Sequence, residues 1–421
     1  MNSLSKSIVA ADFAINGRSY HASARPLVAM CIDGCGDEYL SCSIAHGRMP
    51  HVARLAARGY RGLVRGALPS FTNVNNCAIV TGVSPAQTGI GGNYIIDPET
   101  GEEVMTNSSR FLRRETILAA ASAAGRRVAM ITAKDKLREL LSRNMNGIAF
   151  SAEKAHEAML PGDSPSSVEA LLGPAPAIYS ADASLYVLRA GPALIKTGRA
   201  DLLYLSLTDY MQHSYAPDAP ESLDFYAAID VEIGRILELG ALIAATADHG
   251  MNAKCRADGK ANVIFLESLL TERFGPGFRV ICPITDPYVA HHGALGSAVT
   301  VYFPTDGKRN IDPAAIAASI LEQPGIAEVY DRATAAKKCE LPADRIGDLF
   351  VLSGRDVVVG RTPAQHDLSQ LHGTLRSHGG RYEEMVPLIL SEPLNARYRQ
   401  LAEGDPRNFD LLDFLCNGTL T

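Results

Sequence analysis

The sequence lacks the features that mark membrane, secreted and nucleic-acid-binding proteins. No stretch approaches the ~18 unbroken apolar residues that a membrane-spanning helix needs, and residues 1–21 hold no apolar core followed by a small-residue cleavage site. The 40 lysines and arginines are scattered among 46 acidic residues, so no basic surface for nucleic acid is predicted. We therefore expect a soluble protein of the cytoplasm that binds neither membranes nor nucleic acid.

Cysteine patterns typical of disulfide frameworks or structural metal sites are also missing. The eight cysteines include no C-x-x-C pair, and several lie within apolar runs such as the one around Cys31. Because 421 residues can bury a sizeable core without covalent cross-links, we expect reduced and buried thiols. The sequence has no internal repeat or obvious linker, and its length predicts about two to three domains.

Apolar runs alternate with segments of helical spacing along most of the chain. The runs that predict buried strands span residues 25–34, 126–133, 201–209, 241–250 and 385–393. Helical spacing occupies residues 49–59, 116–125, 134–143 and 220–238, and an Asn-Gly turn within 13–21 predicts a short hairpin. This alternation is typical of an α/β protein with a mostly parallel sheet between layers of helices.

The pattern changes between residues 255 and 375. Segments 297–304, 313–323, 326–332 and 346–360 predict a β-α-β-β order with stricter alternation and more polar residues. We interpret this region as a smaller α+β cap subdomain inserted into the main domain. The predicted division is a core of residues 1–254 and 376–421 and an inserted subdomain of residues 255–375.

Three of the predicted strands end in an aspartate: Asp33, Asp209 and Asp248. The carboxyl ends of strands in an open α/β sheet face the ligand crevice, so three carboxylates would gather at one rim and need neutralisation. The alternative for each aspartate is a cap on the next helix. His213 follows Asp209 by four residues, which is one turn of a helix, and His249 follows Asp248 directly. Carboxylates combined with imidazoles favour zinc or another first-row divalent metal.

A threonine stands where a loop meets the next helical segment. Thr72 precedes a helical pattern over residues 73–81. As an N-cap, its hydroxyl would serve only the helix. As a nucleophile at a helix N-terminus, it would face an anionic substrate, and a nearby metal would lower the pKa of its hydroxyl. The residues alone favour neither interpretation.

These features, in this order, resemble the alkaline phosphatase superfamily. The resemblance rests on Asp33-Gly34, the Thr72 segment, Asp209-x3-His213, Asp248-His249-Gly250 and a late His-Gly, and it covers residues 27–252 and 376–400. It implies a large mixed sheet between helices, two metal ions and a serine or threonine nucleophile. Within the superfamily, residues 69–94, 247–254 and 375–380 are similar to the phosphonoacetate hydrolase family.

The resemblance implies two sets of metal ligands. One metal would be held by Asp209, His213 and His378, and the other by Asp33, Asp248, His249 and the Thr72 hydroxyl. His378 is chosen by the resemblance, since sequence logic alone does not separate it from His292 or His372. Two zinc ions are expected, with Mn²⁺ or Fe²⁺ as substitutes. Their four positive charges against three aspartates leave a site that attracts a phosphonate dianion. Asn93 resembles the family residue that donates to a phosphoryl oxygen, and its alternative is an asparagine in a glycine-rich turn.

The activity that the resemblance implies is hydrolysis of the carbon–phosphorus bond of phosphonoacetate, through a phosphothreonine intermediate on Thr72. Breaking this bond expels a carbanion, which is a poor leaving group unless its charge delocalises into the substrate carboxylate beside a cation. Lys134 and Lys136 follow a predicted strand and Lys254 follows His249 closely, so these lysines are the candidate cations. The alternative for each lysine is a solvated surface charge.

Other functions remain open. A sulfatase is disfavoured because Cys77 lacks the following x-Pro-x-Arg pattern, and a cofactor-independent phosphoglycerate mutase would have a serine nucleophile and a longer insertion. A nucleotide pyrophosphatase/phosphodiesterase is the closest rival, and it would need an aromatic slot for which Tyr94 or Tyr210 is available. A non-catalytic metal-binding scaffold is disfavoured by the intact ligand set. The expected partner is a small-molecule phosphonate, and a homodimer is possible.

Overall fold

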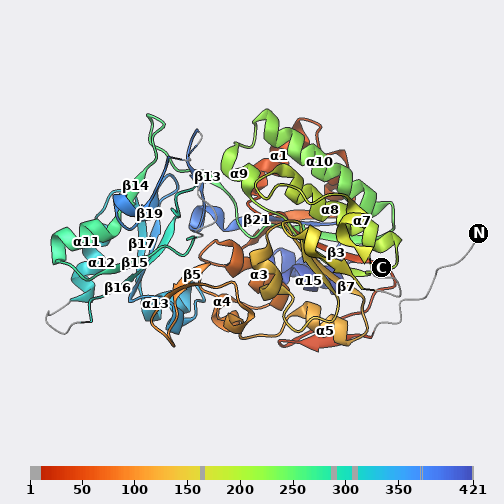
Figure 1. Ribbon diagram of the computed structural model, residues 1–421, viewed down its shortest axis with the longest axis horizontal. Coiled ribbons are helices and arrows are strands. Elements are labelled where there is room, and N and C mark those ends of the chain that lie inside the picture. Colours follow the sequence, from red (N-terminus) through yellow and green to blue (C-terminus); the bar gives the residue numbers. More distant parts are fainter. Residues whose placement is uncertain are drawn as a thin grey trace, which may run out of the picture.

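The computed structural model describes residues 11–161, 166–285, 292–305, 312–369, 371 and 373–419 (Figure 1). It has a large lobe built around a seven-stranded sheet and a smaller lobe built around a four-stranded sheet. The predicted α/β class, with a large and mostly parallel sheet between helices, is confirmed. 

The large sheet has the strand order β4-β21-β12-β3-β11-β7-β8. Its strands are β3 (Leu27–Cys31), β4 (Tyr60–Arg65), β7 (Val128–Thr132), β8 (Ile148–Ser151), β11 (Leu202–Ser206), β12 (Leu242–Thr246) and β21 (Met385–Leu390). All run in one direction except β21, which is antiparallel to both of its neighbours. Every residue of β3, β7, β11 and β12 is buried, because helices cover both faces of the sheet.

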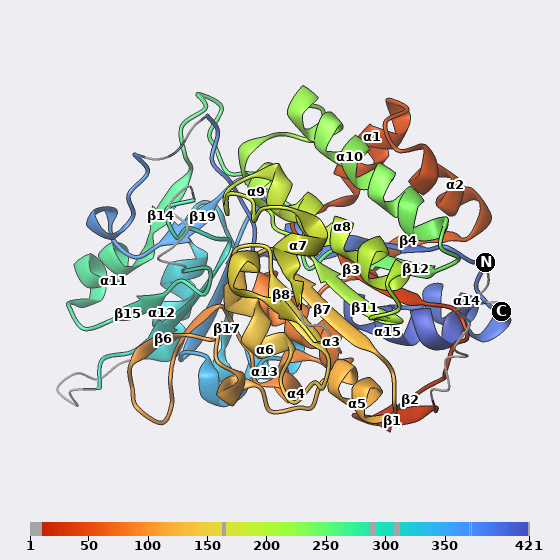
Figure 2. The same cartoon turned by 45° about the vertical axis from the view of Figure 1, so that its right-hand side comes forward.

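Helices pack on both faces of this sheet (Figures 1 and 2). One face carries α1 (Asp37–Ala45), α2 (Pro50–Arg58), α8 (Ala181–Lys196) and α10 (Pro220–Leu237). The opposite face carries α3 (Thr72–Thr81), α5 (Ile117–Ala123), α6 (Arg138–Leu141) and α15 (Leu411–Asp413). Shorter helices are α4 (Pro85–Thr88), α7 (Val168–Leu172), α9 (Tyr210–Ser214) and α14 (Ala396–Ala402). Helix α3 is buried along its whole length, so its polar residues must find partners inside the protein.

The smaller lobe is an antiparallel sheet of order β15-β16-β18-β17 with helices beside it. Its elements are β14 (Val263–Phe265), α11 (Leu266–Phe274), β15 (Arg279–Ile281), β16 (Ala298–Tyr302), α12 (Pro313–Leu321), β17 (Ile326–Asp331), α13 (Arg332–Lys338), β18 (Leu349–Ser353) and β19 (Val358–Gly360). The predicted β-α-β-β order is confirmed by β16, α12, β17 and β18. The prediction did not include β15, α11 or α13.

The chain enters and leaves the smaller lobe at neighbouring points. Strand β13 (Asn252–Ala253) pairs antiparallel with β20 (Arg376–Ser377), with Asn252 opposite Ser377 and Ala253 opposite Arg376. This short ladder lies between the two lobes in Figure 1. The proposed division of the chain at residues 254 and 376 stays a prediction.

Local predictions had mixed outcomes. The hairpin is confirmed as β1 (Phe13–Ile15) and β2 (Arg18–Tyr20), with Asn16 and Gly17 in the left-handed conformation that a two-residue turn requires. The helix expected over residues 134–143 is wrong: a 3₁₀ turn over Asp135–Leu137 precedes the four-residue α6. The sequence patterns also missed β4 and β8. The remaining short strands are β5 (Tyr94–Ile96), β6 (Glu103–Met105), β9 (Met159–Leu160) and β10 (Ser166–Ser167).

All eight cysteines are free thiols, and five of them are buried, as the sequence predicts. None of the helices among the described residues is long and apolar enough to cross a membrane. The cytoplasmic location stays a prediction.

Candidate metal centre and catalytic site

The three strand-end aspartates meet at one rim of the large sheet. Strands β12, β3 and β11 are neighbours, and Thr246, Cys31 and Ser206 at their ends stand in register. Asp248, Asp33 and Asp209 follow these ends within three residues and are at most 4% exposed. Gly34, at φ +71°, permits the close approach, because a Cβ there would lie only 3.0 Å from Cβ of Asp209. The rim arrangement expected from strand polarity is therefore present.

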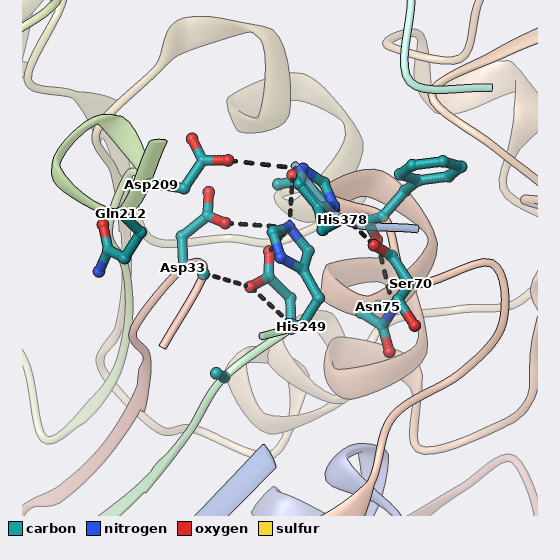
Figure 3. Close-up of polar contacts among 12 residues, drawn as sticks. Asp33, Ser70, Asn75, Asp209, Gln212, His249 and His378 are labelled. Carbon is teal, nitrogen blue, oxygen red and sulfur yellow. Dashed lines mark hydrogen bonds and ion pairs between the residues drawn. The ribbon is translucent and has the colours of Figure 1, made fainter. Parts of the chain in front are cut away.

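The helix-cap alternative is wrong for these aspartates. Asp209 occupies the N-cap position of α9, but its side chain makes no capping hydrogen bond. The helix after Asp33 is α1, whose N-cap is Gly36, and Asp248 leads into β13. Their carboxylates point instead toward imidazoles, as Figure 3 shows for Asp33 and Asp209 beside His249 and His378.

Backbone carbonyls orient three histidines of this site. Nδ1 of His213 lies 2.7 Å from the carbonyl of Arg376, Nδ1 of His249 lies 3.0 Å from that of Gly250, and Nδ1 of His378 lies 2.7 Å from that of Ser70. A carbonyl only accepts, so each Nδ1 carries the proton and donates it. In the neutral ring, Nε2 then presents a lone pair to the site, which is the usual arrangement of metal-binding histidines.

Lone pairs face one another across the site. Nε2 of His213 lies 2.9 Å from Oδ2 of Asp209, and Nε2 of His249 lies 3.3 Å from Oδ1 of Asp33. Oδ1 of Asp33 is buried and has no hydrogen-bond donor among the described residues. Two acceptors held this close need a proton or a metal cation between them. The donor set therefore fits a divalent metal with nitrogen and oxygen ligands.

The described part of the chain contains two groups of potential metal ligands, and within each group the ligand atoms lie within 4.8 Å of one another. One group contains Asp33, Asp248 and His249, and the other contains Asp209, His249 and His378. The resemblance places His213 rather than His249 with Asp209 and His378. The geometry thus puts His249 between both groups, and its ring stacks on that of His378 at 3.5 Å between centroids. The division of ligands between two metals stays a prediction.

The carboxylates differ in proton affinity because their neighbours differ. Burial raises the pKa of Asp33 well above its usual value, and the charges of Asp209 and Asp248 add to the effect. Burial also raises the pKa of Asp248 to about 7. Burial acts in the same direction on Asp209, but Lys134, His213 and His378 outweigh it and hold the pKa of Asp209 well below its usual range. Two buried carboxylates that resist ionisation gain most from a bound divalent cation.

Two of the histidines, His249 and His378, are held neutral in the same environment. Burial lowers the pKa of His249, although Asp33 and Asp209 oppose the shift. Burial and the neighbouring rings of His249 and His213 lower the pKa of His378 well below its usual value. Neutral imidazoles are the form that binds metals.

A side chain of helix α3 orients the carboxylate of Asp248. Oδ2 of Asp248 accepts a hydrogen bond from Asn76 at 3.2 Å, and Oδ1 accepts from the backbone N–H groups of Gly34 and His249 at 3.2 and 3.0 Å. Asn76 is held in turn by Tyr204, whose hydroxyl donates to its Oδ1 at 2.8 Å. Sequence reasoning missed this asparagine. The signal was available, since Asn76 is one of three asparagines in this helical segment, and a buried polar side chain must be hydrogen-bonded.

Thr72 is the first residue of α3 and does not cap it. The N-cap is Phe71, without a side-chain capping bond, and the Thr72 hydroxyl lies 3.5 Å from Nε2 of His249. The hydroxyl therefore faces the potential metal ligands at the N-terminus of a buried helix, where backbone N–H groups favour negative charge. The structure removes the capping alternative, and the nucleophilic role stays a prediction.

The turn before Thr72 is bound to the loop that carries His378. The backbone N–H of Ser70 donates to the carbonyl of Gly379 at 3.1 Å, and its hydroxyl donates to that of Gly380 at 3.0 Å. Gly379 has φ +121°, and a Cβ there would lie 2.5 Å from the Phe71 ring. Thr72 and His378 are thus positioned by one set of contacts.

A small cavity opens from these residues toward the smaller lobe. It is lined by Thr72, Asn93, Lys134, Lys136, Asp209, His213, Ile284, His292 and His378. Oδ1 of Asn93 accepts the backbone N–H of Asn73 at 2.9 Å, which leaves the Nδ2 end of its amide for the cavity. Nζ of Lys134 lies 3.4 Å from Oδ1 of Asp209. The structure therefore brings together Thr72, Asn93 and two of the three candidate lysines.

Two placements differ from the sequence analysis. Lys254 does not line the cavity: it is fully buried, and its ammonium donates to Glu383 at 2.8 Å and to the carbonyl of Arg355 at 2.6 Å. His292, set aside as a rejected alternative to His378, is buried and lies against His213 at 5.1 Å between ring centroids. His372 lies outside the described residues. The local sequence did not distinguish Lys254, which is buried in an ion pair, from Lys134 and Lys136, which line the cavity, because all three follow short strands.

Comparison with known proteins places the chain. A sequence model of the family described as "Type I phosphodiesterase / nucleotide pyrophosphatase" matches residues 27–381. The chain belongs to this family. The family lies within the alkaline phosphatase superfamily, as the sequence resemblance predicts, and this member is a hydrolase of a metal-dependent superfamily.

Solved structures of the family are similar over nearly the whole chain. A phosphonoacetate hydrolase from Sinorhizobium meliloti 1021, in complex with phosphonoacetate, is 43% identical, with a TM-score of 0.89 over 97% of this chain and 98% of that one. The same enzyme in complex with phosphonoformate matches equally well. Murine ectonucleotide pyrophosphatase/phosphodiesterase 5 is 16% identical, with a TM-score of 0.59 over 93% of this chain and 94% of that one, and it supports the fold alone.

Proposed function

We propose that the chain hydrolyses the carbon–phosphorus bond of phosphonoacetate to acetate and phosphate, with Thr72 as nucleophile and two zinc ions as cofactors. The carrying observation is the cavity itself. Its lining combines Thr72 and the potential metal ligands Asp209, His213 and His378 with the cations Lys134 and Lys136. A small substrate that carries both a phosphonate and a carboxylate matches this combination of groups. The relative bound to phosphonoacetate supports the same assignment.

The metals would be held by Asp33, Asp209, His213, Asp248, His249 and His378, with the Thr72 hydroxyl beside them. When bound, they neutralise the buried carboxylates, bind phosphonate oxygens and lower the pKa of the Thr72 hydroxyl. Oγ1 of Thr72 attacks phosphorus, the P–C bond breaks, and the electron pair moves to carbon and into the carboxylate. The proton that the Thr72 hydroxyl loses passes through solvent to the leaving carbon and completes acetate, and one water then hydrolyses phosphothreonine to the free Thr72 hydroxyl and phosphate.

The remaining cavity residues bind and orient the substrate. Nδ2 of Asn93 donates to a phosphoryl oxygen, since its Oδ1 is already bonded to the N-terminus of α3. Lys136, with Lys134 beside it, stabilises the charge that develops on the carboxylate as the carbon leaves. A fixed cation at that position lowers the barrier because the charge is larger in the transition state than in the substrate.

A nucleotide pyrophosphatase/phosphodiesterase is the second candidate, favoured by the family description. Such an enzyme needs an aromatic slot for a base. Within the described residues, the cavity lining contains no tyrosine: Tyr94 lies in β5 with its hydroxyl toward Glu103, and Tyr210 packs near Tyr179. The described lining therefore favours the smaller substrate.

A substrate panel tests the proposal. Purified protein with measured metal content would be offered phosphonoacetate, p-nitrophenyl phosphate monoesters and diesters, and dinucleotides. We expect phosphonoacetate to have the highest kcat/KM, about two zinc ions per chain, and loss of activity with chelator. Preference for dinucleotides would support the second candidate. Activity unaffected by chelator, with no stoichiometric metal, would refute the dinuclear site.

The lysine assignment has its own test. Lys136→Met should lower kcat/KM for phosphonoacetate by roughly 30- to 1,000-fold, the equivalent of about 2–4 kcal/mol, because a charge-assisted contact is lost. An aryl phosphate ester has no carboxylate and a good leaving group, so its hydrolysis should fall far less. Lys134→Met should slow both reactions, since Lys134 also contacts Asp209. Equal losses on both substrates in Lys136→Met would contradict the assignment.

A further inference from the structure

A carboxylate lies between the two cavity lysines in the sequence. Lys134 and Lys136 both line the cavity, whereas Asp135 lines a separate cavity of about 210 Å³ on the other side of the turn. If the Asp135 side chain faced the lysines, its charge would offset one of theirs and weaken the attraction for a second carboxylate. The turn of residues 134–136 therefore has to keep the Asp135 carboxylate away from the ammonium groups of Lys134 and Lys136.

Three side chains hold the Asp135 carboxylate away from the lysines. Nε of Arg138 donates to Oδ1 at 2.7 Å, and the Ser151 hydroxyl donates to Oδ1 at 2.9 Å. Nζ of Lys154 lies 3.3 Å from Oδ2. Partial burial acts to raise the pKa of Asp135, but these partners outweigh it and hold the pKa below its usual value, so the carboxylate is ionised. Its charge is balanced by Arg138 and Lys154 rather than by the cavity lysines.

The backbone of the turn is fixed by Thr132 at the end of β7 and by Glu153, which follows β8. The N–H of Asp135 donates to Oε2 of Glu153 at 2.7 Å, and the carbonyl of Lys134 accepts from the Thr132 hydroxyl at 2.9 Å. Ser151 ends β8, Glu153 follows it, and β8 pairs in parallel with β7, which leads into the turn. The side chain and the backbone N–H of Asp135 thus tie the turn to the end of β8, and Thr132 ties it to β7.

We propose that Asp135, held by Ser151 and Glu153, is a positioning residue that directs Lys134 and Lys136 into the cavity and determines selectivity for substrates with a carboxylate. The inference rests on the proposed function, in which these lysines bind the substrate carboxylate. Residues of β8 that touch no substrate would then set the preference between a phosphonate with a carboxylate and a simple phosphate ester.

The test compares two substrates in several variants. Asp135→Ala should lower kcat/KM for phosphonoacetate by about 10- to 100-fold, mainly through KM, because misplaced binding groups cost this much. Hydrolysis of p-nitrophenyl phosphate should fall by a smaller factor, through Lys134 and its contact with Asp209 alone, since the ester has no carboxylate for Lys136 to bind. Asp135→Asn keeps an acceptor for Ser151 and should fall between the wild type and Asp135→Ala. Asp348→Ala is the matched control, because the Asp348 carboxylate, like that of Asp135, accepts from an arginine; its other partner is a backbone N–H, and it lies in the smaller lobe.

The outcomes separate the inference from the proposed function. A selective loss in both Lys136→Met and Asp135→Ala, with no loss in Asp348→Ala, supports the inference. A selective loss in Lys136→Met with wild-type selectivity in Asp135→Ala overturns the inference alone. A wild-type protein that does not cleave phosphonoacetate overturns the proposed function. If Asp135→Ala fails to fold, Ser151→Ala removes one of the three side-chain contacts of Asp135, together with a hydrogen bond from the backbone N–H of Lys154, and should move selectivity in the same direction by a few fold. Unchanged selectivity there overturns the inference.

Discussion

The rim of the large sheet changes the sign of its charge between neighbouring strands. Strands β12, β3 and β11 are followed by Asp248, Asp33 and Asp209, whereas β7 is followed by Lys134 and Lys136. The aspartates are buried and arranged around histidine lone pairs, while both lysines are partly exposed and flank Asp135, which contacts Ser151 at the end of β8. The acidic part thus lies in the buried centre of the large sheet, and the basic part lies near its edge, after the strand next to β8.

This difference indicates that the acidic part and the basic part have different chemical roles. In the proposed mechanism, the acidic part acts on the phosphoryl group, which every substrate of such a site carries. The basic part acts on a substituent that only some substrates carry. Changes in the acidic part should therefore affect all reactions, and changes in the basic part should affect selectivity. Each of the following experiments strengthens or breaks this comparison.

The largest effect is expected at the nucleophile. Thr72→Ala should lose at least about 10³-fold in kcat on both phosphonoacetate and an aryl phosphate, because the group that forms the covalent intermediate is gone. Thr72→Ser should keep a measurable part of both activities. Steady-state kinetics with both substrates on one preparation measures this. Near-wild-type turnover in Thr72→Ala would mean that water attacks phosphorus directly.

Lys254 should behave unlike the lysines of the basic part. Lys254→Met leaves Glu383 buried and without its ion-pair partner, which should lower the free energy of unfolding by about 3–5 kcal/mol. The double variant Lys254→Met/Glu383→Gln removes both charges and should recover part of the loss. Lys136→Met, at a partly exposed position, is the comparison and should change stability little. Denaturant unfolding measures all three, and equal stability of Lys254→Met and the wild type would contradict the assignment of Lys254 to the interior.

The smallest effect is the pH dependence of the metal-free protein. Folding raises the pKa of Asp248 from 3.8 to about 7, so between these values the folded state binds more protons than the unfolded chain. Stability of the chelated protein should therefore fall as pH rises through this window, by up to about 1.4 kcal/mol per pH unit from this group. Asp248→Asn should flatten that slope in thermal unfolding measured from pH 5 to 8. Parallel slopes in the two proteins would contradict the shift.

The buried centre of the fold could be predicted from sequence, and its edges could not. Strands β3, β7, β11 and β12 are continuous apolar runs because both of their faces are covered, and this leaves a clear signal. The edge strand β4 is only partly buried and carries arginines, and the edge strand β8 has four residues, so neither produces such a run. The 134–143 segment has helical spacing, but the turn that positions Lys134 and Lys136 uses its first residues.

The residues of the site show the same contrast: some could be predicted from the neighbouring sequence, and others depend on contacts between distant parts of the chain. Asp33, Asp209 and Asp248 were recognisable because strand polarity alone brings strand ends to one rim. His292 and the burial of Lys254 depend on how the smaller lobe packs against the large one, which no local pattern encodes. The choice of His378 came from family resemblance, and the structure places it beside His249 and Asp209.

The ladder of β13 and β20 has a consequence for how such enzymes diversify. It holds the two ends of the excursion into the smaller lobe one strand spacing apart, roughly 5 Å. Closing a loop across that gap costs only about 0.6 kcal/mol more for each doubling of its length. His249 lies just before this junction and His378 directly after it, so the segment between them can lengthen, shrink or be exchanged without displacing either histidine. We therefore expect changes in the smaller lobe to alter the part of the cavity lining that it supplies, Ile284 and His292, and to leave the metal ligands in place.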